Sequence, residues 1–190
     1  MSAQIHDDKV FEDITFDKGA IRNAEYNNCI FKKCDLSECE FAVTKFIDCV
    51  FENCNLSMLK LERCTLNDVA FKHCKLLGVN FSRCEDFLFT VRFESCILDY
   101  ASFMGKKMPK TRFAKTSLKE TTFTQATLTG SVFDECNLAD TVFRQTDLTA
   151  VNFSTALNYI IDPELNTMNK AIFPAHGLEG LLYKYNLKIV

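Results

Sequence analysis

The sequence predicts an all-β solenoid in which the chain turns a corner every five residues. Apolar residues recur at every fifth position, and a second column of small or β-branched residues lies two positions before each of them. Neither the 3.6-residue period of a helix nor the two-residue alternation of a strand produces a strict five-residue repeat. All 10 cysteines and most of the 18 phenylalanines among the 190 residues fall in these two columns.

The apolar column begins at Phe11 and continues without a break to Phe81. It resumes at Leu88, two residues out of register, and ends at Phe153. A repeating chain buries one continuous core, so we predict that these centres point inward. They include Phe31, Leu36, Phe41, Phe51, Leu56, Phe71, Leu76, Phe81, Phe93, Phe113, Phe133 and Phe153.

The second column holds the cysteines, and three interpretations of them can be compared. A zinc site needs convergent Cys and His ligands, but the three histidines are scattered along the chain. Disulfides need a side-chain geometry that parallel, stacked cysteines do not have. We therefore expect small buried hydrophobes, with neither metal nor cofactor. The cysteines that we expect to form one inward column are Cys34, Cys54, Cys74, Cys96 and Cys136.

Four segments share a motif of a small residue, Asp or Asn, Leu and two further residues. They resemble the A(D/N)LXX unit of pentapeptide-repeat proteins, and the match extends from residue 11 to about residue 155. The resemblance implies a right-handed quadrilateral parallel β-helix with four pentapeptides per coil. The centre and the small residue would lie inside, and the other three residues outside. The segments are residues 34–38, 54–58, 136–140 and 146–150.

The chain is thereby divided into three parts. We expect an N-terminal lead-in at 1–10, the β-helix at 11–156 with a two-residue slip near 85–88, and a C-terminal segment at 157–190. Residues twenty apart would then stack at the ordinary strand spacing of about 4.8 Å, where opposite charges stabilise and like charges repel. The signs alternate along one face, as this stacking requires, at Glu12, Lys32, Glu52, Lys72 and Glu94.

The repeat is interrupted at residues 85–89, where Asp86 stands in place of a centre. One interpretation is a packed corner in which Phe87 or Phe89 covers the core. The other is a kink that contacts a partner, because function in a repetitive scaffold concentrates where the repetition breaks.

A second departure places Lys106 in the small inward column. A lysine is costly to bury without a partner, so we expect this coil to bulge outward. With Arg112, Lys115 and Lys119 it would form either a basic patch or a merely solvated face.

The five-residue rule stops at residue 157. Beyond Pro174, apolar residues follow helical spacing, and Leu187 then alternates with polar neighbours as in a short strand. We expect a small C-terminal helical cap that covers the open end and joins two copies. The predicted dimer contacts are Leu178, Leu181, Leu182, Tyr185 and Ile189.

Residues 74–80 and 159–166 are similar to stretches of the topoisomerase-directed branch of the family. This branch includes Qnr-type quinolone-resistance, albicidin-resistance and microcin-immunity proteins. The resemblance implies a homodimeric rod that binds DNA gyrase or topoisomerase IV by imitating duplex DNA, and that modulates the enzyme or protects it from inhibitors such as quinolones. The residues proposed for partner binding are Asp48, Asp68, Asp86 and Phe87.

The alternative function is a general protein interaction scaffold with an unrelated partner, because the net charge is only −3. Direct nucleic-acid binding through the lysines is a weaker alternative. We expect no enzyme, since motifs for a nucleophile, a phosphate loop or a dinucleotide are missing. We also expect a cytoplasmic protein without membrane contact, because no apolar stretch approaches the roughly 20 residues of a membrane span.

Overall fold

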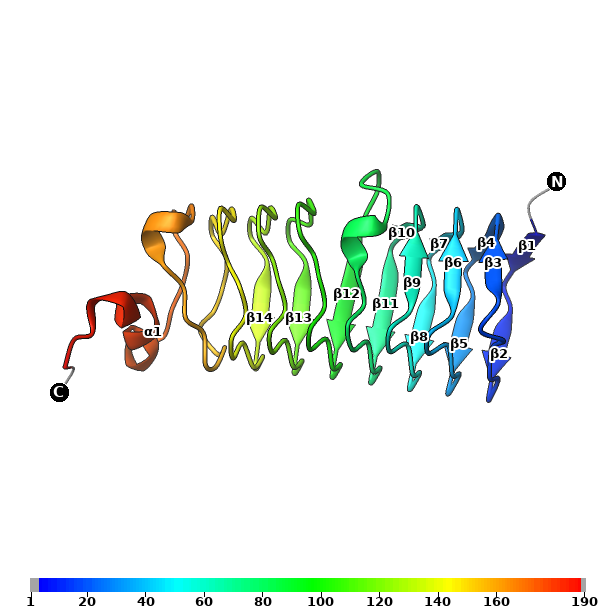
Figure 1. Cartoon of the computed structure of the whole chain (residues 1–190), viewed down its shortest axis with the longest axis horizontal. Helices are drawn as coiled ribbons and strands as arrows, with labels where there is room; N and C mark the ends of the chain where they lie inside the picture. The colour runs from blue at the N-terminus through cyan, green and yellow to red at the C-terminus, as the bar shows by residue number, and fades with distance from the viewer. Residues whose placement is uncertain (1–3, 189–190) are drawn as a thin grey trace.

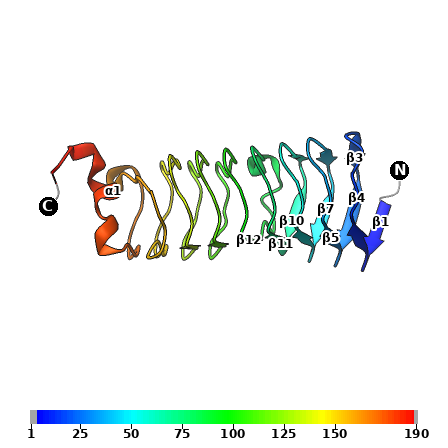
Figure 2. The same cartoon turned by 90° about the horizontal axis from the view of Figure 1, so that it is seen from below.

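The computed structural model describes residues 4–188, which form a rod of stacked coils with the two ends of the chain at opposite ends of the rod (Figure 1). The predicted fold is confirmed: the chain is a right-handed parallel β-helix of roughly seven coils with a short helical segment at its C-terminal end. Figure 2 shows the same stack after a quarter turn, with the C-terminal segment covering one end. Within the described residues, no helix has the length and apolarity needed to cross a bilayer.

Three sides of the rod carry parallel sheets, which we name after their first strands. The β1 face contains β1 (Gln4–Asp7), β4 (Ala24–Asn27), β7 (Lys45–Ile47) and β10 (Thr65–Asn67). The β3 face contains β3 (Ala20–Arg22), β6 (Glu40–Ala42) and β9 (Lys60–Glu62). The β2 face contains β2 (Val10–Glu12), β5 (Ile30–Lys32), β8 (Val50–Glu52), β11 (Val69–Lys72), β12 (Val91–Glu94), β13 (Arg112–Ala114) and β14 (Val132–Asp134). The fourth side, the bridge face, is joined by single bridges from Thr15 to Leu157.

The register follows the predicted period. Phe51 pairs with Phe71, twenty residues on, whereas Phe71 pairs with Phe93 across the two-residue slip. The alternating charges are paired in the same register, from Glu12 opposite Lys32 to Lys72 opposite Glu94. Opposite charges therefore face each other along the β2 face.

Phenylalanine rings stack through the core. The rings of Phe31 and Phe51 lie 4.5 Å apart between centroids and 8° from parallel, and those of Phe113 and Phe133 lie 4.8 Å apart and 2° from parallel. Each buried ring contributes on the order of 1.5–3 kcal/mol through burial. All twelve centres named from the sequence are at most 3% exposed.

The ten cysteines are free and buried. The amides of Cys34 and Cys54 each approach the Sγ atom of the next cysteine in the column at 3.4 Å. Burial raises the pKa of the Cys49 thiol to about 11 and that of Cys64 to about 12, so these thiols stay protonated at neutral pH.

A residue in the left-handed region closes most of the pentapeptides. Asp48 and Asp68, two residues after their centres, have φ of 54° and 51°. This conformation costs a non-glycine residue about 1–2 kcal/mol, which the cross-coil pairing must offset. Gly78, with φ of 67°, avoids this cost, and a Cβ atom there would lie 2.6 Å from Met58 Sδ, so that a larger residue would force the Met58 side chain to move.

The coils extend beyond 11–156 at both ends. At the N-terminal end β1 pairs with β4, and the His6 ring stacks on Tyr26 with centroids 4.8 Å apart. At the C-terminal end, bridges continue to Ile172. The predicted lead-in and the start of the predicted C-terminal segment therefore take part in the cross-coil pairing.

Short helical turns complete the chain. One lies at the slip, η1 (Phe81–Arg83), and one in the last coil, η2 (Pro163–Leu165). The end segment consists of η3 (Ala175–Gly177), α1 (Glu179–Leu182) and η4 (Tyr183–Tyr185). The predicted strand near Leu187 is not formed at that residue, and Ile189 lies outside the described residues.

Candidate functional site

The acidic excess of the first four coils is concentrated on the β1 face. Its strands and the corners that follow them carry five carboxylates and one lysine. On the same coils the β2 face carries three acids and three bases. The β3 face, continued by η1 in the fourth coil, carries two acids and four bases, and the bridge face carries three acids and two bases. The β1 face charges are Asp7, Asp8, Glu25, Lys45, Asp48 and Asp68.

Neighbouring cations neutralise part of this acidic face. Lys45 Nζ lies 3.1 Å from Glu25, and Arg92 Nη1 lies 2.5 Å from Asp68. Asp48 stands one coil before Asp68, with its amide donating to Asn67 O at 2.9 Å. Among the described residues no cation lies within 4 Å of the Asp48 carboxylate, so Asp48 keeps its charge exposed while Asp68 is paired.

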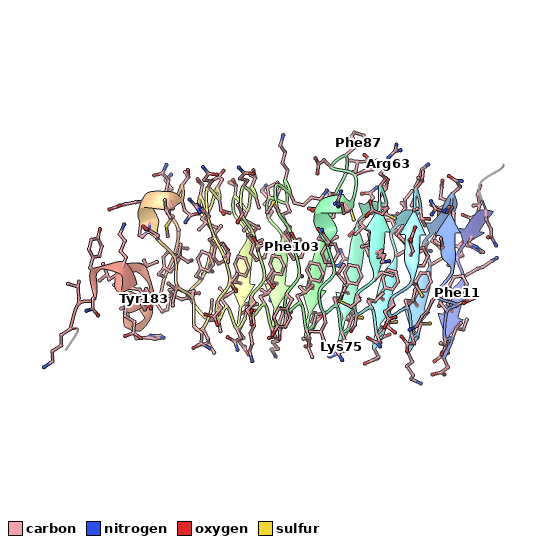
Figure 3. All side chains as sticks on the ribbon, viewed as in Figure 1. Phe11, Arg63, Lys75, Phe87, Phe103 and Tyr183 are labelled. Carbon is pink, nitrogen blue, oxygen red and sulfur yellow. The ribbon has the colours of Figure 1, made fainter. Side chains whose placement is uncertain are left out.

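A loop projects from the β1 face at the slip, where residues 85–88 leave the coil (Figure 3). Phe87 is at the tip and is 77% exposed, the largest exposure among the large apolar residues that the structure describes. Phe89 returns to the core at 6% exposure, with its ring edge-on to Phe81. The packed-corner interpretation is therefore confirmed for Phe89, which covers the core. Phe87 extends into solvent, and its contact with a partner stays a prediction.

The placement predicted for Leu88 was wrong. It was expected to resume the inward column, but it is 52% exposed and has φ of 59°. The two extra residues are accommodated in the loop, so the inward position passes to Phe89. Regular five-residue spacing returns at Phe93.

Two ion pairs tie the loop to the coils beside it. Glu85 lies 3.3 Å from Arg63 Nε on the preceding coil, and Asp86 lies 2.7 Å from Lys106 Nζ on the following coil. Lys106 itself is only 1% exposed. The loop is therefore held from both sides.

The expected outward bulge at Lys106 was wrong. The coil keeps its register, since Lys106 O accepts a hydrogen bond from Thr127 N at 2.8 Å and Met108 is 1% exposed. The lysine can be buried because the slip brings Asp86 within reach. The sequence could have predicted this ion pair, because Asp86 and Lys106 both break the repeat and lie twenty residues apart.

The three other basic residues of the expected patch, Arg112, Lys115 and Lys119, form no single patch with Lys106. Arg112 on the β2 face is paired with Asp134 at 2.7 Å. Lys115 lies at the corner after β13, and Lys119 lies on the bridge face beside Ser117. These cations therefore lie on two adjacent faces and the corner between them, whereas Lys106 is buried beneath the β1 face.

The predicted dimer contacts lie at the C-terminal end and differ in exposure. Leu178 and Tyr185 are 44% and 53% exposed, whereas Leu181 is half-buried and packs on the core. Leu182 is half-buried and lines a hollow of about 870 Å³ together with Tyr183. An apolar surface is therefore open at this end of the rod.

The inward columns, the four-sided coil and the projecting loop define a solenoid built from five-residue repeats. Residues 24–103 match the family model described as "Pentapeptide repeat region", and residues 116–154 match "Pentapeptide repeats (8 copies)". The chain belongs to the pentapeptide-repeat proteins. No curated protein matches its sequence.

Solved structures of QnrB1, a plasmid-mediated fluoroquinolone resistance protein, share this fold. Full-length QnrB1 is 17% identical, with a TM-score of 0.63 over 96% of this chain and 100% of that one. A trypsin-treated point variant of QnrB1 is also 17% identical, with a TM-score of 0.65 over 99% of both chains. A second trypsin-treated point variant is 15% identical, with a TM-score of 0.59 over the full length of both.

Proposed function

We propose that this protein binds DNA gyrase or topoisomerase IV in the cytoplasm as an imitation of duplex DNA, without catalysis. Binding would modulate the topoisomerase or protect it from inhibitors such as quinolones. The observation that carries this proposal is the β1 face, where the acidic excess of four coils lies on one side of a rod. The likeness to QnrB1 along the whole chain supports it.

Charge and apolar contact would have different roles in this binding. The basic surface that a topoisomerase offers to DNA attracts the β1 face over about one Debye length, roughly 8 Å at physiological salt. Asp48 contributes to this attraction, whereas Asp68 and Asp86 are already paired with cations. Phe87 would supply the buried aromatic anchor that dominates many interfaces.

The first test is a supercoiling and cleavage-complex assay of gyrase titrated with the protein. It is run at low and at physiological salt, with and without a fluoroquinolone. We expect salt-sensitive inhibition or loss of drug-stabilised cleavage. The D48K variant should weaken the effect, whereas D140K, at an exposed corner of another face, should not. Folded protein without effect at tens of micromolar would reject the proposal.

A general interaction scaffold is the second candidate function. It is favoured by the charge balance of the β2 face and by the paired state of Asp68 and Asp86. A scaffold of this kind would bind its partner through Phe87 and the C-terminal end. Its binding would be insensitive to D48K and to salt, and this separates it from a DNA mimic.

The proposal includes a homodimer joined through the C-terminal end. Leu178 and Tyr185 offer exposed apolar surface there, next to the hollow lined by Leu182 and Tyr183. Light scattering of the full chain and of the L178E variant tests this arrangement. We expect the mass of two chains for the former and of one chain for the latter. One-chain mass for the wild type would refute it.

A further inference from the structure

A buried ammonium group lies beneath the projecting loop. The residues of this inward column are small in the neighbouring coils, where Cys64, Cys84, Ala126 and Thr146 occupy it. Lys106 alone is long and charged, and it is among the most completely buried large side chains of the described residues. A lysine is retained in such a position only when its charge is paired, because isolated burial costs several kcal/mol.

At the carbonyl of Cys84, the ammonium group of Lys106 takes the place of a backbone amide. In the coils on either side, the carbonyl of the column residue accepts from an amide of the next coil, as Cys64 O does from Glu85 N at 2.9 Å and Lys106 O from Thr127 N at 2.8 Å. Among the described residues no backbone amide donates to Cys84 O. Lys106 Nζ donates to it instead. The two-residue slip leaves this acceptor without its amide, and the lysine satisfies it.

The same ammonium group reaches the loop itself. Lys106 Nζ donates to Asp86 Oδ1 at 2.7 Å and lies 4.8 Å from the centroid of the Phe89 ring. Lys106 Nζ therefore contacts Asp86 near the start of the loop, Phe89 directly after the loop and the carbonyl of Cys84 directly before it. Hydrogen bonds from a charged donor are stronger than neutral ones, and a cation over an aromatic face adds to them.

We infer that Lys106 is a positioning residue that latches the loop at residues 85–88 to the solenoid and fixes the direction in which Phe87 projects. The loop is presented in one arrangement instead of an ensemble, because its two ends are bound to one buried cation. This inference concerns the order of the loop and does not depend on which partner the protein binds.

Limited proteolysis of the full chain by chymotrypsin tests the latch, because Phe87 is an exposed cleavage site and cleavage reports the opened population. K106M keeps the length of the side chain but removes its charge, and K106R keeps the charge. T146V alters a buried residue of the same column two coils away, where Thr146 Oγ1 donates to Phe123 O at 2.9 Å. Mass spectrometry locates the cut, and circular dichroism shows that the coils are folded.

We expect cleavage after Phe87 to be about tenfold faster in K106M, and to stay within about twofold of wild type in K106R and T146V. D86A should also accelerate cleavage, by a smaller factor because Lys106 keeps its bond to Cys84 O. Asp86 is 71% exposed in its side chain, so this variant decides the question even if K106M does not fold. The inference would be overturned if D86A were cleaved after Phe87 at the wild-type rate, or if T146V accelerated this cleavage as much as K106M does.

Discussion

Phe113 lies at the centre of the aromatic stack, and its replacement by alanine measures how strongly the stack holds the coils together. Its ring lies 5.3 Å from Phe93 and 4.8 Å from Phe133, nearly parallel to both, and meets Phe103 and Phe123 edge-on. Removing a fully buried ring costs about 3–5 kcal/mol, through lost burial and the cavity left behind. The unfolding entropy of a chain of this size is on the order of 0.4 kcal/mol/K, so Tm should fall by about 10 °C.

Phe11 provides the matched control for this prediction. It is half-buried in the first coils and has one parallel neighbour, Phe31 at 4.8 Å. Because less of the ring is buried there, F11A should lower Tm by only about 2–5 °C. Thermal unfolding followed by circular dichroism compares the two variants. A fall for F113A no larger than that for F11A would refute the view that the stacked core carries the stability.

Three further predictions concern the surface, a corner and the C-terminal end. F87A should change the unfolding free energy by less than about 0.5 kcal/mol in denaturant titration, yet weaken partner binding about 30-fold in calorimetry, because the ring is exposed until a partner covers it. G78A should lower the unfolding free energy by about 1–3 kcal/mol, because residue 78 has a positive φ and the added Cβ would meet Met58 Sδ. Adding M58A to G78A should recover only part of this loss, because the backbone strain at residue 78 remains. The hydrogen bond and charge of Lys184 lower the pKa of Asp162, so this pair contributes stability above the unfolded carboxylate pKa and loses it as the pH falls through the folded value. Hydrogen exchange at residues 175–185 should therefore accelerate below about pH 4 relative to the central coils, and unchanged relative protection would contradict the role of the pair.

The five-residue period was sufficient to predict the coils, because the inside of a solenoid repeats the same requirement at every rung. An inward position accepts only an apolar or small residue, so Phe31, Cys54 and Phe133 could be placed without any knowledge of distant contacts. The outward positions carry no such constraint. Which acids lie on one face became apparent only when the residues were sorted by face, and the pairing of Asp68 with Arg92 depends on side-chain directions across the slip.

The limits of the coils were harder to predict, because the ends relax the inward rule. His6 is a polar ring that stacks on Tyr26 at the open end, and a search for apolar centres passes over it. Met168 and Phe173 pack on the core 15 and 20 residues after Phe153, in register with the repeat, but Asn158 and Pro163 occupy the two intervening centre positions and interrupt the apolar column. Hydrophobic periodicity therefore identifies the middle of a solenoid better than its ends.

The slip and the acidic face together suggest how a repetitive rod is placed on a partner. Charge on the β1 face is spread over several coils, so electrostatic attraction alone changes little when the rod shifts by one coil, about 4.8 Å. The loop lies where the acidic rungs end and Lys107 and Lys110 begin on the same face. Because Phe87 projects at one rung only, an apolar socket for it would fix the register of the whole rod. F87A should then lose positional specificity more than salt-dependent attraction, whereas D48K should show the reverse.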